Sequence, residues 1–149
     1  MSMQSPNQQD QKIELRLRTL RTLWIALFLS VLIYFVMTIF VHRSENAVPN
    51  NSLFLILLLM GLSITSVSFL VKSKLLNKAV ELQQVPLVQQ GYIVAWALSE
   101  VSALLGLLDY FATGDRYYYV LFIISAFGYL LHFPRREHVI NATFKNPGF

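Results

Sequence analysis

Four long apolar segments alternate with short polar stretches along the chain. They cover residues 23–41, 53–71, 91–112 and 117–133. The first, second and fourth lack acidic and basic residues, whereas the third contains Glu100 and Asp109. A helix needs about 20 apolar residues to cross the hydrocarbon core of a bilayer, with a range of roughly 17 to 25. Because a spanning helix also satisfies its own backbone hydrogen bonds in lipid, the pattern predicts four transmembrane helices.

The expected fold is therefore an all-α, integral membrane four-helix protein that forms a single domain over residues 1–149. The connections are short, so helices adjacent in the sequence should be antiparallel neighbours. Residues 1–11 are expected to be a disordered tail, residues 72–90 a cytoplasmic loop and residues 134–149 a polar cytoplasmic tail. The first half of that loop, residues 72–82, is expected to continue the second helix. From Lys12 onward a helical pattern precedes the first span. This segment is interpreted either as the first helix where it emerges from the membrane or as a separate amphipathic helix at the membrane surface.

The basic residues are strongly biased to one side of this topology. Ten lie before the first span, between the second and third spans, or after the fourth, namely Lys12, Arg16, Arg18, Arg21, Lys72, Lys74, Lys78, Arg135, Arg136 and Lys145. The opposite side holds only Arg43 and Arg116. Since basic loops stay in the cytoplasm, both termini are expected there. The short loops and the charge bias favour a bacterial inner membrane.

Composition agrees with a membrane protein. Of the 149 residues, 55% are hydrophobic and 13% are charged, whereas about a quarter are charged in a typical soluble domain. This argues against a soluble enzyme, a nucleic-acid binder and a disordered protein, and the net charge of +4 is interpreted as a topology signal. The absence of cysteine excludes disulfides and thiol catalysis. The expected partners are the lipid bilayer and other membrane subunits or further copies of the chain, and not nucleic acid.

Glu100 is the most informative residue, because it lies near the middle of the third apolar segment. A charged carboxylate at that depth costs at least about 2.5 kcal/mol on insertion scales, and such residues commonly have a function. The cost is smaller if the carboxyl group is protonated. Two interpretations stay open. Glu100 binds a proton or cation, or it is only a protonated group that hydrogen-bonds a serine or a carbonyl across a helix interface.

Small and hydroxyl-bearing residues surround Glu100 in the predicted helices. One stripe of the third span consists of Ala95, Ser99, Ser102, Ala103 and Gly106. The second span carries a matching face with Gly61, Thr65 and Ser68. Small residues let helices approach closely in lipid, so Glu100 should face a helix–helix seam. The candidate ion-binding residues are Glu100, Ser99, Thr65 and Ser68, and the candidate packing residues are Gly61, Ala95, Ser102, Ala103 and Gly106.

The remaining polar residues do not indicate a catalytic or metal site. Asp109 lies farther out on another face and is interpreted as an interfacial carboxylate near Arg116. His42 and His132 fall at opposite edges of the membrane, and His138 lies in the tail, so they do not form a haem or metal site. No catalytic motif is present in the sequence. No catalytic residue, metal or cofactor is therefore expected, and the protein is not expected to be an enzyme.

In residues 89–107 a polar loop precedes a helix in which Ala97, Leu98 and Glu100 form the order A-L-x-E, and Gly106 follows six residues later. With the helix upstream of the loop, residues 72–112 resemble the carboxylate-bearing hairpin of subunit c of rotary ATP synthases. The resemblance implies that Glu100 is an ion-binding carboxylate that is protonated while it faces lipid and released at a channel in a partner subunit. The expected function is thus that of a small non-enzymatic membrane protein that binds a proton or cation at Glu100. The alternative is a structural or assembly subunit of a membrane complex.

Overall fold

The computed structural model describes residues 6–42, 50–114 and 116–143. Within these ranges the chain is helical and contains no strand, which confirms the all-α fold class. The helices are α1 (Pro6–Phe40), α2 (Asn51–Glu81), α3 (Val85–Ala112), α4 (Tyr119–Leu131) and α5 (Arg136–Thr143).

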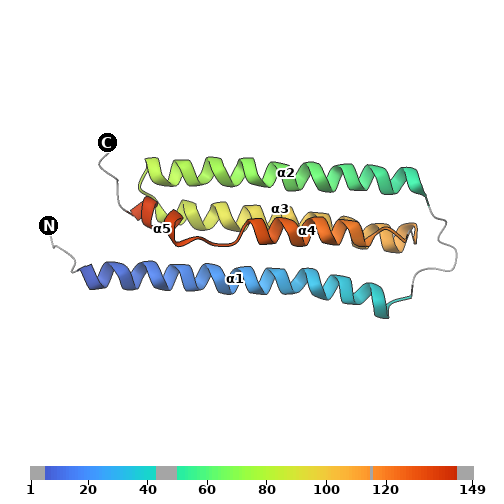
Figure 1. Ribbon diagram of the computed structural model, residues 1–149, viewed down its shortest axis with the longest axis horizontal. Coiled ribbons are helices and arrows are strands. Elements are labelled where there is room, and N and C mark those ends of the chain that lie inside the picture. The colour runs from blue at the N-terminus through green and yellow to red at the C-terminus, as the bar shows by residue number, and fades with distance from the viewer. Residues whose placement is uncertain (1–5, 43–49, 115, 144–149) are drawn as a thin grey trace.

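Helices α3 and α4 lie between α1 and α2 (Figure 1). Both α3 and α4 pack against α1 and α2 and against each other, whereas α1 and α2 do not touch within the described residues. Contacts between α2 and α3 join Gly61 to Ser102 and Lys72 to Tyr92, so these two helices run in opposite directions. Helix α5 packs across α1, α2 and α3 at one end of the bundle, which we call the α5 end.

Three helices are long and apolar enough to cross a membrane. They comprise Asp10–Phe40, Asn51–Glu81 and Val85–Ala112. Helix α4 is apolar but has 13 residues, which corresponds to about 20 Å of helix. These lengths and compositions are those of a membrane protein, and a crossing by α4 stays a prediction.

Residues 6–11 are helical, which corrects the expectation of a disordered tail up to residue 11. Proline suits the first turn of a helix, where its missing N–H group is not needed, and the next proline or glycine of the sequence lies beyond the end of α1. Asp10 also forms a 3.7 Å ion pair with Arg136 at the start of α5. Residues 1–5 of the expected tail lie outside the described residues. The segment from Lys12 onward belongs to the same continuous helix as the first span.

The second helix continues beyond its apolar segment, as expected for residues 72–82, and helix is also present at residues 85–90 and in the expected polar tail. Helix α2 continues to Glu81, and the chain turns at Gln83, whose φ of 51° is in the left-handed region. Helix α3 then begins at Val85 with Pro86 in its first turn. The expected tail, residues 134–149, contains α5, because Val139 and Ala142 are fully buried where α5 crosses the bundle. Residues 144–149 lie outside the described residues.

Among the helical glycines (Gly61, Gly91, Gly106 and Gly128), Gly128 of α4 has the least room for a side chain. A Cβ atom added there would lie 2.7 Å from Ser99 Oγ, 3.1 Å from Ser99 Cβ and 3.2 Å from Thr65 Cγ2. The absence of a side chain at Gly128 therefore lets α4 approach both α2 and α3. Small residues at such contacts allow helices to pack through dispersion forces, which is the main attraction between helices in lipid.

We expect Gly128→Ala to destabilise the bundle. Overpacking typically costs about 1–3 kcal/mol, which exceeds the roughly 1 kcal/mol that alanine gains over glycine in helix propensity. Thermal unfolding in mild detergent measures the effect. Ser99→Ala removes the nearest atom, so the double variant should recover part of the loss, while Ser99→Ala alone should change little. Additive losses in the double variant would contradict the predicted contact.

Candidate functional site

Glu100 lies on the side of α3 that faces α1. Its Oε1 atom accepts a 2.7 Å hydrogen bond from Ser30 Oγ, and Ser30 Oγ also lies 2.6 Å from the carbonyl oxygen of Leu27. Tyr34, one turn farther along α1, interacts through its hydroxyl group with both Glu100 and Ser30. Glu100 is partly exposed. The carboxyl group is therefore at a helix seam without being sealed inside it.

Ser30 has two acceptors and only one hydroxyl hydrogen. If Glu100 is ionised, the hydroxyl donates to Glu100, and the short contact with the Leu27 carbonyl carries no hydrogen bond. If Glu100 is protonated, its own hydrogen goes to Ser30 Oγ, and the Ser30 hydrogen goes to Leu27. Ser30 thus links the Glu100 carboxyl group to the backbone of α1.

Tyr129 of α4 adds another hydroxyl group near the carboxyl group. It lies within electrostatic range of both Glu100 and Tyr34. The Tyr129 side chain is fully buried, and its hydroxyl group has no hydrogen-bond partner within the described part of the chain. A buried polar group without a partner costs about 1–3 kcal/mol. The surroundings of Glu100 thus contain an unused polar group.

The other predicted ion-binding residues lie on a different side of α3. Thr65 Oγ1 is 2.9 Å from Ser102 Oγ, and Ser102 Oγ donates to the Gly61 carbonyl at 3.0 Å. Ser99 Oγ donates to the Ala95 carbonyl of its own helix at 2.9 Å. These residues occupy the seam between α2, α3 and α4, and among the described residues none of them hydrogen-bonds Glu100. The structure therefore brings Thr65 and Ser102 together and separates both from Glu100.

All five residues expected to serve in packing are buried, namely Gly61, Ala95, Ser102, Ala103 and Gly106. A Cβ atom added at Gly106 would lie 3.0 Å from the side chains of Leu121 and Phe122 on α4. The stripe of small residues on α3 thus contacts α4 as well as α2.

Sequence reasoning missed Ser30 and Tyr34, although a signal for them exists. Ser30, Tyr34 and Thr38 recur every four residues in an otherwise apolar segment, which places them on one face of α1. Thr38 is buried and lies 3.2 Å from the Tyr118 hydroxyl. The spacing of these residues identifies the face of α1 that points into the bundle.

A second polar cluster occupies the α5 end. His132 is fully buried; its Nε2 atom is 2.7 Å from Ser68 Oγ, and its Nδ1 atom is 3.5 Å from Lys72 Nζ. Trp96 Nε1 donates to the His132 carbonyl at 3.1 Å. Lys72 Nζ lies 4.5 Å from the centre of the Tyr92 ring, a cation–π contact. Ser68, expected near Glu100, therefore belongs to this basic and aromatic cluster.

Tyr92 connects the cluster to α5. The backbone N–H of Arg135 donates to the Tyr92 hydroxyl oxygen at 3.0 Å, and Tyr92 Oη lies 2.6 Å from His138 Nδ1. The Tyr92 hydroxyl group thus links the backbone before α5 to the His138 ring, and the donor of the Tyr92–His138 bond depends on the histidine tautomer. Burial lowers the pKa of His138 below its ordinary value of 6.5, and the charges of Lys72 and Arg135 lower it further, against an opposing effect of Glu137.

Asp109 is fully buried, and Thr113 Oγ1 donates to its Oδ1 atom at 2.8 Å. No cluster of three or more metal-ligating side chains occurs within residues 6–42, 50–114 and 116–143. Comparisons of the chain with protein-family models, curated proteins and solved structures found no match. The candidate functional site is thus Glu100 with Ser30, Tyr34 and Tyr129.

We expect the docking of α5 to weaken as the pH falls from about 7.5 to 5. The pKa of His138 is lowered in the folded protein, so the unfolded chain binds more protons below about pH 6.5, and stability is lost as the pH falls through the folded-state value. Hydrogen exchange of the amides of residues 139–143, corrected for its intrinsic pH dependence, measures the opening. Tyr92→Phe should increase exchange already at pH 7.5. His138→Gln should remove this part of the pH dependence, and His42→Gln, at the opposite end of the bundle, should leave it unchanged. Equal pH profiles for the wild type and His138→Gln would contradict the prediction.

Proposed function

We propose that this chain is a small non-enzymatic integral membrane protein that binds a proton, or a cation in its place, at Glu100. The observation that carries the proposal is the position of Ser30 Oγ between Glu100 Oε1 and the Leu27 carbonyl oxygen. In this arrangement the gain or loss of one proton reverses the direction of the bond between Glu100 and Ser30. The protonation state of Glu100 is thereby coupled to the backbone of α1.

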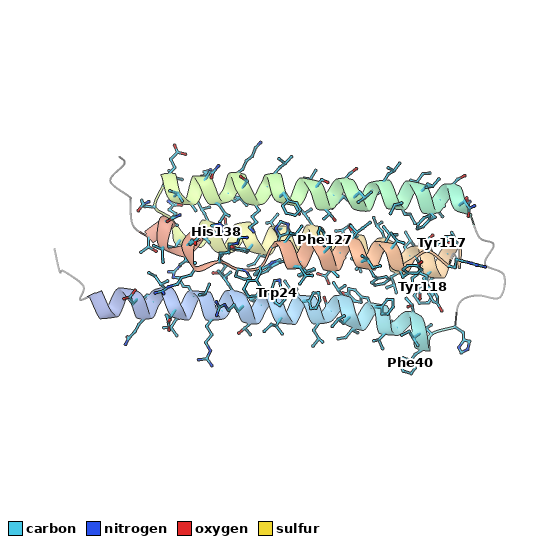
Figure 2. The ribbon with its side chains drawn as sticks, viewed as in Figure 1. Trp24, Phe40, Tyr117, Tyr118, Phe127 and His138 are labelled. Atoms are coloured by element: carbon cyan, nitrogen blue, oxygen red, sulfur yellow. The ribbon has the colours of Figure 1, made fainter. Side chains whose placement is uncertain are left out.

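The proposed topology has four antiparallel spans with both termini in the cytoplasm. Helix α4 would cross together with the residues that flank it, because it packs against α1, α2 and α3. Tyr117 and Tyr118 lie at the end of the bundle opposite His138 (Figure 2), where an aromatic belt would meet the outer membrane surface. Arg135 and Arg136 are on the α5 side, as the cytoplasmic assignment of that end requires. The short loops and charge bias favour a bacterial inner membrane.

Access to Glu100 would come from the α1 side. In the most apolar part of α1 only 11% of the residues are buried, compared with 44% of the residues in the corresponding part of α3. Helix α1 is thus the peripheral helix, and Glu100 is partly exposed at its seam. A small displacement of α1 would expose the carboxyl group without disturbing the packing of α2, α3 and α4. The Tyr34 and Tyr129 hydroxyl groups would offer hydrogen bonds to an incoming proton carrier or cation.

The resemblance to subunit c supports Glu100 as the ion-binding residue. In this chain the carboxyl group faces α1, a helix that precedes the subunit-c-like hairpin. We propose that α1 shields the neutral carboxyl group within one copy, and that other membrane subunits or further copies join along lipid-facing surfaces. A structural or assembly subunit is the second candidate, because the bond between Ser30 and Glu100 also links two helices.

We expect dicyclohexylcarbodiimide, which reacts with protonated carboxyl groups in apolar surroundings, to label Glu100 in membranes. Labelling should decrease as the pH rises, because ionisation removes the reactive form. Peptide mass spectrometry measures the labelled fraction, and the exposed Glu81 provides an internal comparison. Ser30→Ala removes a charge-assisted hydrogen bond from the ionised form, so labelling should persist to higher pH. Ser66→Ala, which removes a hydroxyl group bonded only to its own helix, should not change the profile. Absence of labelling at every pH in a folded protein would favour the structural candidate.

Glu100→Gln and Glu100→Leu separate the two candidates further. A proton site should lose proton movement across proteoliposomes in both variants, while Gln retains the fold because its amide also donates to Ser30. A purely structural group should tolerate Gln without loss of any transport, and Leu should lower the thermal stability by about 1 kcal/mol, the typical net value of a hydrogen bond. Proton flux in proteoliposomes and the melting temperature in detergent are the two measurements. Unchanged flux in the folded Gln variant would disprove proton binding as the function of Glu100.

A further inference from the structure

A groove of about 350 Å³ lies at the α5 end, between α2 and α5. Its polar residues include Lys72, Ser73 and Asn77 from α2 and His138 and Asn141 from α5. Phe69 adds an apolar surface on the side toward the middle of the bundle. Figure 2 shows His138 of α5 at this end, far from Phe40 at the other end of the bundle. We call this feature the α2–α5 groove.

The groove contains positive charge without a matching carboxylate. The Lys72 ammonium group lies against the Tyr92 ring and near His132, and Arg135 is within its electrostatic range. In the described ranges, the single side-chain ion pair within 4.0 Å joins Arg136 to Asp10. Glu137 is exposed and acts on His138 at longer range. A partly buried cation with no carboxylate in contact favours the binding of an anion.

The hydrogen-bond donors of the groove suit a phosphate group. Lys72 supplies a compact charge with three donors, and Ser73, Asn77 and Asn141 supply neutral donors. His138 Nδ1 bonds the Tyr92 hydroxyl group, and in the tautomer in which Nδ1 accepts that bond, Nε2 is a further donor. Phosphate oxygens accept several such bonds at once.

The depth of the groove indicates where that phosphate comes from. Lys72 directly follows the apolar segment of residues 53–71, so it lies at the boundary between hydrocarbon and headgroups. Phe69 and Leu76 line the groove beside the polar residues, as a surface for an acyl chain requires. Anionic lipids attract basic residues at this level of the membrane.

We propose that the α2–α5 groove binds the phosphate group of an anionic glycerophospholipid. Lys72 provides the charge, and the side chains of Ser73, Asn77, His138 and Asn141 provide directional hydrogen bonds. The bound lipid joins α2 to α5, so it holds the C-terminal helix against the bundle. This site is separate from Glu100 and depends on the proposed topology only for which leaflet supplies the lipid.

Native mass spectrometry of the full chain, released from vesicles of equal phosphatidylglycerol and phosphatidylcholine, tests the proposal. The wild type should retain phosphatidylglycerol preferentially. Lys72→Gln should reduce that retention about fivefold, the effect of one basic residue on anionic lipid. Lys74→Gln is the matched control, because Lys74 is exposed on the same helix and does not line the groove. Equal losses in the two variants would show general surface attraction and overturn the proposal.

A second variant tests the groove without removing the packing of the Lys72 side chain. Asn141→Asp places a negative charge in the groove at an exposed position and should also reduce retention, with an unchanged melting temperature in lipid-free detergent. Full retention in this variant would contradict the site. Displacement of the lipid by inorganic phosphate at millimolar concentration would identify free phosphate as the ligand and overturn the lipid assignment. Glu100→Gln should retain the lipid, and Lys72→Gln should keep carbodiimide labelling, so the two proposals fail separately.

Discussion

The close approach of α3 and α4 to α2 is the interaction on which the remaining structure depends. In lipid no hydrophobic force draws apolar helices together, so contact must come from dispersion and from hydrogen bonds between helices. Gly61 and Gly128 allow the helix backbones to approach, which provides the dispersion contact. Ser102 provides the hydrogen bond, because its hydroxyl group lies opposite the Gly61 carbonyl. This packing occupies one side of α3. The side that carries Glu100 is consequently left for α1.

The two polar sites differ because their depths in the bundle differ. Glu100 lies in the apolar middle, where an ionised carboxylate is costly and a neutral one can form a chain of hydrogen bonds to Leu27 through Ser30. Lys72 lies at the α5 end, where water and headgroups would reach it in the proposed topology. In the proposed function, Glu100 would carry a proton, and the α2–α5 groove would hold an anion. Helix α1 covers the first site, and α5 borders the second.

Helix α1 is the element that connects fold and proposed function. It contacts α3, α4 and α5, and among the described residues it makes no contact with α2. Trp24 holds it near the α5 end, where its Nε1 atom donates to the Tyr129 carbonyl at 2.9 Å and its ring packs edge-on against Phe133. Farther along, Ser30 and Tyr34 meet Glu100. A peripheral helix attached by a few polar contacts can respond to the charge of one carboxyl group more readily than a central helix can.

The sequence by itself determined the helical fold class, three of the four predicted spans as long apolar helices, and the unusual position of Glu100, because these depend on local composition and on the thickness of a bilayer. The stripe of small residues on α3 was also visible, since helical periodicity alone groups them. Only the tertiary structure decided that Glu100 meets Ser30 of α1, while Thr65 and Ser68 of α2 bond Ser102 and His132. Which helix meets Glu100 depends on how the other helices are arranged around α3. Because the second span directly precedes the third in the sequence, α2 was the expected partner of Glu100. The burial of α5 was decided in the same way, because Val139 and Ala142 find an apolar surface only where α1, α2 and α3 converge.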